Sequence, residues 1–304
     1  MLKKLNRVIA PAFYILLIVF LVLYLRHVDF GKLAHVHIAW GYLVLSVFVA
    51  LGARYLGSFT WFTILRSLGA RELHIHKAMV AVYAKAWLGR YIPGTAPWIL
   101  GKIYFASKHG VSKQKLAVSA LLEGGLQITT LLVFSLLLLM FDKRLDVLGG
   151  GFKILMMLVA LAGIVILLPP VYNRIVGKAY RLLRRKALDA ENKASAETIT
   201  RGAALYLVDA AVSGFSLFFI AKGVDPGLAW HNIVFVIGAA SLATVVSMLA
   251  IFAPGGLGVR EGIQLVLFSL IMPKELAVMV TVLMRLWSVC VDLLFFALTR
   301  PWAR

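Results

Sequence analysis

The chain has 304 residues, of which 62% are hydrophobic and only 15% are Asp, Glu, Lys or Arg, whereas an ordinary soluble domain carries about 25% charged residues. A soluble monomer cannot hide so much apolar side chain, so the composition excludes the globular classes and indicates an integral membrane protein. The formal net charge of +19 suits the Lys- and Arg-rich cytoplasmic loops of such a protein and does not by itself indicate nucleic acid. The single cysteine, Cys290, excludes an intrachain disulfide and a cysteine-based metal cluster.

Seven apolar runs are long enough to cross roughly 30 Å of hydrocarbon, which takes about 20 residues. They lie at 9–25, 40–65, 115–141, 152–171, 203–221, 230–252 and 276–298. The first follows Lys3, Lys4 and Arg7, as in a signal peptide, but no small-residue cleavage site follows it, and we expect it to remain as a span.

Two further apolar segments, 78–101 and 254–272, are interrupted by Pro and Gly. Non-helical backbone at membrane depth requires protein or a wet cavity around it. We therefore expect broken or re-entrant elements near 85–101 and 254–262. The predicted fold is an all-α polytopic membrane protein with seven or eight transmembrane helices and these two elements. The breaks fall in different halves of the chain, as in transporters built from inverted repeats, although no residue-by-residue repeat is visible.

The distribution of Lys and Arg predicts the orientation. The segment 172–201 carries eight of them and is the strongest cytoplasmic signal in the chain. A re-entrant segment at 78–101 keeps Lys102, Lys108, Lys113 and Lys115 on that same side. If 254–272 crosses as a broken helix, both termini are cytoplasmic, while Lys143, Arg144 and Lys153 lie outside.

One integral membrane domain is expected over 1–304. Its halves, at about 1–171 and 202–300, are joined by the basic cytoplasmic connector 172–201. The orientation rule that places this connector inside applies to a cytoplasmic (inner) membrane, which is therefore the predicted location.

Several charged or polar side chains fall within the predicted spans, where each needs a partner or a wet cavity. Ser119, Glu123, Gln127 and Thr130 follow one another at helical spacing and should line one inward face. No basic residue in its own helix can neutralise Glu123. Four supporting intramembrane charges lie in other spans, namely Arg54, Asp209, Arg285 and Asp292. Either these charges pair across helices and only lock the bundle, or they serve a site.

Each interrupted segment couples a Pro-Gly break to an arginine. The first contains Arg90, Tyr91, Pro93 and Gly94, and the second contains Gly255, Gly256, Gly258, Arg260 and Glu261. Glycine lets backbone N–H groups approach a ligand, a broken helix exposes a positive N-terminus, and the guanidinium fork suits phosphate oxygens. The pattern predicts an anion site within the membrane. The alternative is that Gly258 and Gly262 only allow close helix packing.

Other chemistry has little support in the sequence. There is no GxxxxGK[ST] loop, no HExxH, no GxSxG and no carboxylate-rich metal cluster. We therefore expect no catalytic residue, cofactor or metal site, and no coupling to ATP.

The string PGGLGVREG at 254–262 resembles the signature of the lysylphosphatidylglycerol synthase transmembrane family, also called flippase-like, which includes the membrane module of the multiple peptide resistance factor. GRYIPG at 89–94 and GVSKQKLAVSALLEGG at 110–125 are similar to the family's first-half motif and acidic helix. The resemblance covers nearly the whole chain and implies a helical bundle with re-entrant elements that moves a modified lipid between leaflets. The chain ends at Arg304 without an aminoacyl-transfer domain, and we therefore expect it not to synthesise lysylphosphatidylglycerol.

The resemblance implies a substrate site made of the residues that match these motifs, namely Arg90, Pro93, Gly94, Glu123, Gly255, Gly256, Gly258, Arg260 and Glu261. The leading hypothesis is a transporter for a phosphate-bearing lipid, such as a modified phospholipid or a polyprenyl-phosphate-linked lipid. In it, Arg90 and Arg260 hold phosphate, while Glu123 and Glu261 balance them, engage an amine or hydroxyl, or carry a proton.

The alternative hypotheses are a membrane-embedded enzyme or accessory subunit of glycolipid, polyprenol or hopanoid synthesis, with Glu123 or Glu261 as general base, and a scaffold for lipid-synthesis enzymes. The expected partners are a membrane lipid and enzymes of lipid or glycan biosynthesis, with no nucleic acid.

Overall fold

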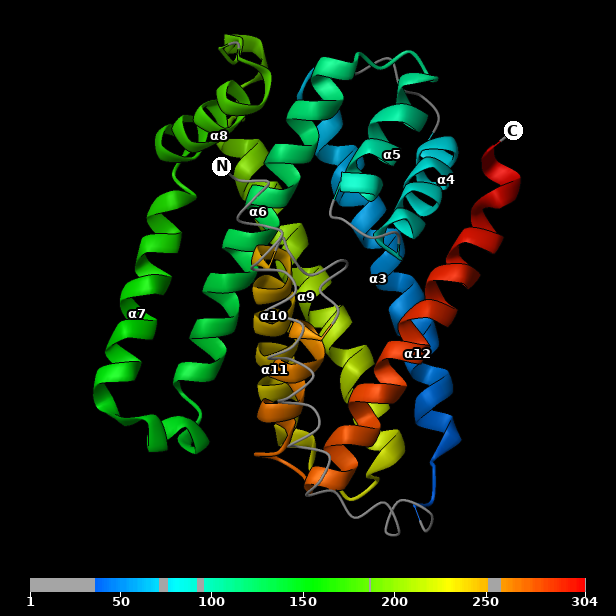
Figure 1. The fold of residues 1–304 in the computed structure, drawn as a ribbon, viewed down its shortest axis with the longest axis vertical. Helices are drawn as coiled ribbons and strands as arrows, with labels where there is room; N and C mark the ends of the chain where they lie inside the picture. Colours follow the sequence, from blue (N-terminus) through cyan, green and yellow to red (C-terminus); the bar gives the residue numbers. More distant parts are fainter. Residues whose placement is uncertain (1–35, 71–75, 92–95, 186, 251–257, 304) are drawn as a thin grey trace, which may run out of the picture.

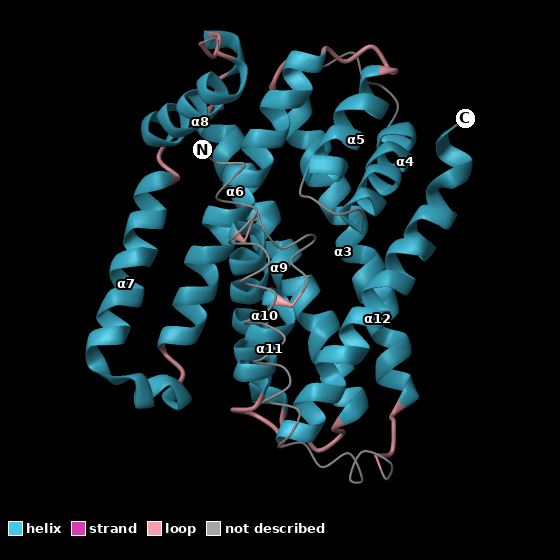
Figure 2. Ribbon diagram, viewed as in Figure 1, coloured by secondary structure: helices cyan, strands magenta, loops and turns pink. Residues whose placement is uncertain are grey.

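A computed structural model of the protein describes residues 36–70, 76–91, 96–185, 187–250 and 258–303, and the regular structure in these ranges is entirely helical (Figure 2). The predicted all-α membrane fold is confirmed. The run at 9–25 lies outside the described residues.

Six helical stretches in the described ranges are long and apolar enough to cross a membrane. They correspond to the six predicted runs that follow 9–25, and their helices pack into one bundle (Figure 1). These helices are α3 (Trp40–Ser67), α6 (Lys113–Met140), α7 (Gly149–Ile166, preceded by the 3-10 turn Lys143–Leu148), α9 (Ala196–Val224), α10 (Ile233–Leu249, preceded by the 3-10 turn Trp230–Asn232) and α12 (Lys274–Thr299, followed by the 3-10 turn Arg300–Ala303).

The first interrupted segment forms a hairpin of two short helices, α4 (His76–Trp87) and α5 (Ala96–Ser107), with the 3-10 turn Leu88–Tyr91 at the end of α4. Twelve residues make a helix of only about 18 Å, too short to cross the hydrocarbon. Figure 1 shows α4 and α5 side by side in one half of the bundle, with the turn between them near its middle. The predicted re-entrant element has this form.

The second interrupted segment also reverses near the middle of the bundle, but it enters from the opposite end. Helix α10 ends at Leu249, and α11 (Val259–Phe268) runs back beside it toward the end where α10 began (Figure 1). We expected 230–252 to cross completely and 254–272 to cross again as a broken helix. Trp230–Leu249 is one of the six stretches long enough to cross, whereas α11, with 10 residues, is only about 15 Å long and does not cross the hydrocarbon by itself. Helix α12 starts at the end of the bundle where α10 began and runs to the predicted side (Figure 1).

The basic connector is partly folded. Helix α8 (Pro169–Arg184) lies at the same end of the bundle as the outer ends of α4 and α5 and the C-terminus, and the 3-10 turn Ala190–Asn192 follows it (Figure 1). Tyr172, Val176 and Tyr180 recur at helical spacing and are buried. The Tyr172 hydroxyl donates to the Leu122 carbonyl of α6 at 2.6 Å, and burial raises its pKa, which keeps it a donor. The connector is therefore attached to the bundle.

Close helix packing depends on small residues. A Cβ on Gly214 of α9 would lie 2.8 Å from the Cα of Ile237 in α10, closer than real Cβ contacts come. The absent side chain lets α10 lie directly against α9. This contact positions the second hairpin in the middle of the bundle.

Basic residues at the opposite end have acidic or polar neighbours. Arg144 lies 3.5 Å from Asp142 and donates to the Asn232 side chain at 2.5 Å, and Lys153 pairs with Asp146. These contacts offset part of the positive charge that the predicted orientation leaves outside.

Candidate functional site

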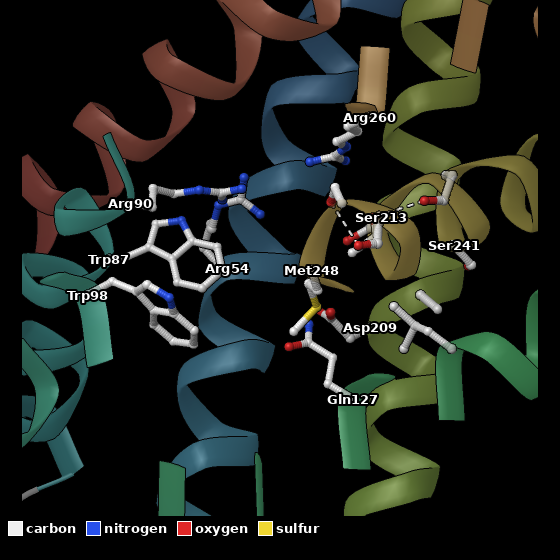
Figure 3. Close-up of a pocket in the computed structure, with 15 residues that line it drawn as sticks. Arg54, Trp87, Arg90, Trp98, Gln127, Asp209, Ser213, Ser241, Met248 and Arg260 are labelled. Carbon is white, nitrogen blue, oxygen red and sulfur yellow. Dashed lines mark hydrogen bonds between the residues drawn. The ribbon is translucent and has the colours of Figure 1, made fainter. Parts of the chain in front are cut away.

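The tips of the two hairpins border a cavity of about 170 Å³ in the middle of the bundle (Figure 3). Arginines from three elements line it: Arg54 from α3, Arg90 from the turn after α4, and Arg260 from the first turn of α11. Arg90 and Arg260 belong to the two segments that Pro and Gly interrupt, which are far apart in the sequence. The structure brings both side chains to one cavity. The predicted convergence of the two interrupted segments is therefore observed for these arginines.

Asp292 neutralises part of this charge. Its carboxylate is buried and accepts hydrogen bonds from Arg54 Nε at 2.5 Å and from the Tyr91 hydroxyl at 2.6 Å. Arg90 lies 3.9 Å from the same carboxylate. A single residue of α12 therefore fixes α3 and the tip of the first hairpin, and two predicted supporting charges, Arg54 and Asp292, pair with each other.

The tip of the second hairpin is shaped by Gly258. Its φ of +82° lies in the left-handed region, which glycine adopts without steric cost. Its N–H donates to the Glu261 carboxylate at 2.7 Å, and the other carboxylate oxygen lies 3.5 Å from Arg285. Glu261 thus caps α11 and joins it to α12 instead of facing Arg260 as a paired carboxylate.

Arg260 differs from the other arginines of the cavity. Across the described ranges no carboxylate lies within 4.0 Å of its guanidinium, and its buried Nε has no hydrogen-bond partner. A buried guanidinium nitrogen without a partner costs free energy. Arg260 is therefore the cavity group best prepared to bind an anion.

The remaining wall of the cavity carries polar side chains without positive charge, beside the apolar Leu131, Ala210, Ala240 and Met248. Gln127 comes from the inward stripe of α6, and Asp209 and Ser213 lie one turn apart on α9. Figure 3 shows Arg90, Trp87 and Trp98 on one side of the view and Gln127 and Asp209 on another. The cavity thus combines cationic, aromatic and hydrogen-bonding surfaces.

Glu123 occupies a different position from the one expected. Its stripe is inward, since Ser119, Glu123 and Thr130 are buried, but Glu123 does not line the cavity. Its carboxylate pairs with Lys102 of α5, whose ammonium lies 4.1 Å from the centre of the Trp98 ring. We expected Lys102 to return to the surface with the loop lysines, and instead it is buried with 2% exposure.

The other predicted residues have definite positions. Tyr91 reaches the site through Asp292, Asp209 lines the cavity, and Arg285 lies beside Glu261. Pro93, Gly94, Gly255 and Gly256 lie outside the described residues.

Sequence reasoning missed the aromatic part of the site. Trp87 and Trp98 both line the cavity, with ring centroids 5.7 Å apart. Arg90 lies over the Trp87 ring at 4.6 Å, within the range of a cation–π contact. Their signal was their position on either side of the first break, where the hairpin brings them together.

Comparison with known proteins identifies the family. The family model described as "Lysylphosphatidylglycerol synthase TM region" matches residues 7–295. The chain belongs to this family. The family is one of membrane proteins linked to lipid handling, and its model covers the membrane region, as expected from the motifs at 89–94 and 254–262. A search of curated proteins found no match.

Proposed function

We propose that this protein moves a phosphate-bearing lipid, such as a modified phospholipid or a polyprenyl-phosphate-linked lipid, between the leaflets of a cytoplasmic membrane. The observation that carries the proposal is Arg260, a half-buried arginine whose Nε is buried without a hydrogen-bond partner and which has no carboxylate partner in the described chain, in a cavity it shares with Arg54 and Arg90. A phosphate can accept two parallel hydrogen bonds from a guanidinium, which makes arginine well suited to hold it. Membership of a lipid-handling family supports a lipid as the source of that phosphate.

The arrangement of the hairpins supports movement across the bilayer. One hairpin enters from each end of the bundle, and their tips meet at the cavity (Figure 1). A head group at this level has one hairpin between it and each side of the membrane. Small displacements of the two tips would open the cavity to one side or the other, as in carriers with a fixed central site. The end that carries α8 and its arginines faces the cytoplasm in this proposal.

A reconstituted assay tests the proposal. Proteoliposomes carry a fluorescent phosphatidylglycerol in both leaflets, and a membrane-impermeant reductant bleaches the outer leaflet, so that loss of the inner signal measures exchange. The wild type should exchange the lipid faster than protein-free liposomes. Arg260→Gln should lower the rate at least about tenfold, because a hydrogen bond to a charged group is worth about 1.5–3 kcal/mol.

Arg201→Gln is the matched control, since Arg201 of α9 is exposed and pairs with Glu197 at 3.0 Å. It should exchange lipid at the wild-type rate. Equal rates for Arg260→Gln and wild type would overturn the assignment of Arg260. Chemical conversion of the lipid by the protein in detergent micelles, where no leaflets exist, would replace transport with an enzymatic function.

A further inference from the structure

Three side chains in the cavity have polar groups that the described protein leaves without partners. Gln127, Asp209 and Ser213 all line the cavity, and none makes a hydrogen bond or ion pair with another described residue. Asp209 is within the electrostatic field of Arg54 but does not contact it. All three are half-buried, and polar groups that face a cavity without a protein partner can hydrogen-bond to a ligand or to water, so this wall has unused hydrogen-bonding capacity.

Hydroxyl oxygens extend the same wall. Ser241, Thr244 and Ser247 of α10 also line the cavity, and each donates its hydrogen to a carbonyl of its own helix at 2.7–2.8 Å. A hydroxyl that donates in this way still has lone pairs and can accept. The wall therefore offers a carboxylate that only accepts, an amide and a serine that donate and accept, and further acceptor oxygens.

A ligand hydroxyl matches this mixture better than an ammonium does. Each hydroxyl donates one hydrogen and accepts through its oxygen, so it can pair with Asp209 and with the Gln127 amide at once. An ammonium only donates, and would satisfy Asp209 but leave the amide hydrogens of Gln127 without an acceptor. A head group without polar atoms would leave all three side chains unpaired, at an appreciable cost.

The polar wall and Arg260 belong to one cavity. A ligand that fills it places an anionic group at Arg260 and its remaining surface against Gln127, Asp209 and Ser213 (Figure 3). Trp98 also lines the cavity and adds aromatic carbon to the surface that the ligand meets.

We infer that the cavity selects a phosphodiester lipid whose head group carries several hydroxyls, as glycerol, inositol and sugars do, with Gln127, Asp209 and Ser213 as the residues that set this specificity. The inference rests on the proposed function, because it assumes that the anion at Arg260 is a lipid phosphate.

Head-group selectivity tests it directly. The full chain in detergent micelles is titrated calorimetrically with four short-chain lipids: phosphatidylglycerol, phosphatidylinositol, phosphatidylmethanol and phosphatidylethanolamine. Phosphatidylmethanol carries the same phosphodiester charge as phosphatidylglycerol but no hydroxyl. The two hydroxyl-bearing lipids should bind at least about tenfold more tightly than phosphatidylmethanol, because a polar site rejects an analogue that leaves its groups unpaired.

Asp209→Ala and Gln127→Ala should each lower this preference about fivefold, the effect of one lost hydrogen bond, while phosphatidylmethanol still binds. Glu197→Ala on the exposed start of α9 and Gln114→Ala at the exposed start of α6 are matched controls, and should keep the full preference.

The outcomes separate the inference from the proposed function. Equal affinities for phosphatidylglycerol and phosphatidylmethanol would overturn the inference and leave the phosphate site intact. Tightest binding of phosphatidylethanolamine, lost in Asp209→Ala, would overturn it in favour of an ammonium at Asp209. Failure of all four lipids to bind would overturn the phosphate site and the inference together. A preference shared by phosphatidylglycerol and phosphatidylinositol supports hydroxyl recognition, and a preference for only one supports it and identifies the size of polyol that fits.

Discussion

Asp292 shows how one buried residue organises the site. With 1% exposure, its carboxylate binds Arg54 and Tyr91 directly and lies near Arg90. A buried charge is tolerated only with partners of good geometry, so the presence of Asp292 within an apolar helix already required a cation nearby. Its position seven residues after Arg285 predicted that both face inward, which the contacts confirm. The partner of each charge could not be deduced, since the helices that meet there are distant in sequence.

Lys102 and Glu123 show the same limit more sharply. The spacing of the α6 stripe correctly predicted that Glu123 is buried, but its partner lies on α5, 21 residues earlier. The two side chains meet only because the first hairpin packs against α6. No local sequence pattern shows that α5 and α6 are in contact at these two residues. The available signal was a lysine among apolar residues, in APWILGKIYFAS, where a surface loop would have been more polar.

The ion pair between Lys102 and Glu123 allows a test of how buried charges affect stability. Lys102→Met leaves the Glu123 carboxylate buried without its cation and should lower the free energy of unfolding by about 3–5 kcal/mol. The double variant Lys102→Met, Glu123→Leu removes both charges and should recover most of that loss. Unfolding by sodium dodecyl sulfate in mixed micelles measures both. If the double variant is as unstable as the sum of the two single variants, the pair contributes through packing and not through charge compensation.

At the scale of elements, the apolar runs were predictable because a span must satisfy its backbone and present apolar side chains over a fixed length. That rule explains why six described spans agree with their runs. It could not show that the chain turns back beside α10, because hydropathy alone does not give the direction of the helix that follows a span. The Pro and Gly residues at 254–258 marked the break, and only the three-dimensional packing of α11 against α10 shows the reversal.

Gly258 provides the test at this scale. A side chain at its φ of +82° is strained, and the left-handed region costs roughly 1–2 kcal/mol for other residues. Gly258→Ala should lower stability by about that amount and also weaken phosphatidylmethanol binding, because the start of α11 positions Arg260. Gly177→Ala in α8, where an added Cβ meets nothing within 4 Å, should be neutral or stabilising. Normal lipid binding by a destabilised Gly258→Ala would show that the cap does not position Arg260.

Over the whole molecule, α12 connects the two halves of the site. Arg285 lies 3.5 Å from Glu261 at the second tip, and its guanidinium lies over the Tyr91 ring of the first tip at 5.8 Å. Asp292, two turns further along, holds the first tip. Because α12 contacts both tips, we expect a displacement of either hairpin to shift the contacts that hold the other. Such coupling would help to prevent both sides of the cavity from opening together.

The distribution of charge over the whole molecule predicts its orientation. The outer ends of α4 and α5, the connector helix α8 and the C-terminus share one end of the bundle (Figure 1), and this end carries most of the loop lysines and arginines. At the other end, Arg144 and Lys153 have acidic neighbours. Lys and Arg in short loops favour the cytoplasmic side, so Lys108 should face the cytoplasm and Val147, which is 83% exposed at the opposite end, should face outward.

In a Cys290→Ala background, which removes the exposed native thiol, Lys108→Cys should react with a membrane-impermeant maleimide only in inside-out vesicles. Val147→Cys should react only in intact cells whose outer barrier has been opened. Because the two positions are compared on the same chain, labelling of both from one side would exclude the two-ended arrangement of hairpins, and exchanged labelling would invert the proposed orientation while leaving the fold unchanged.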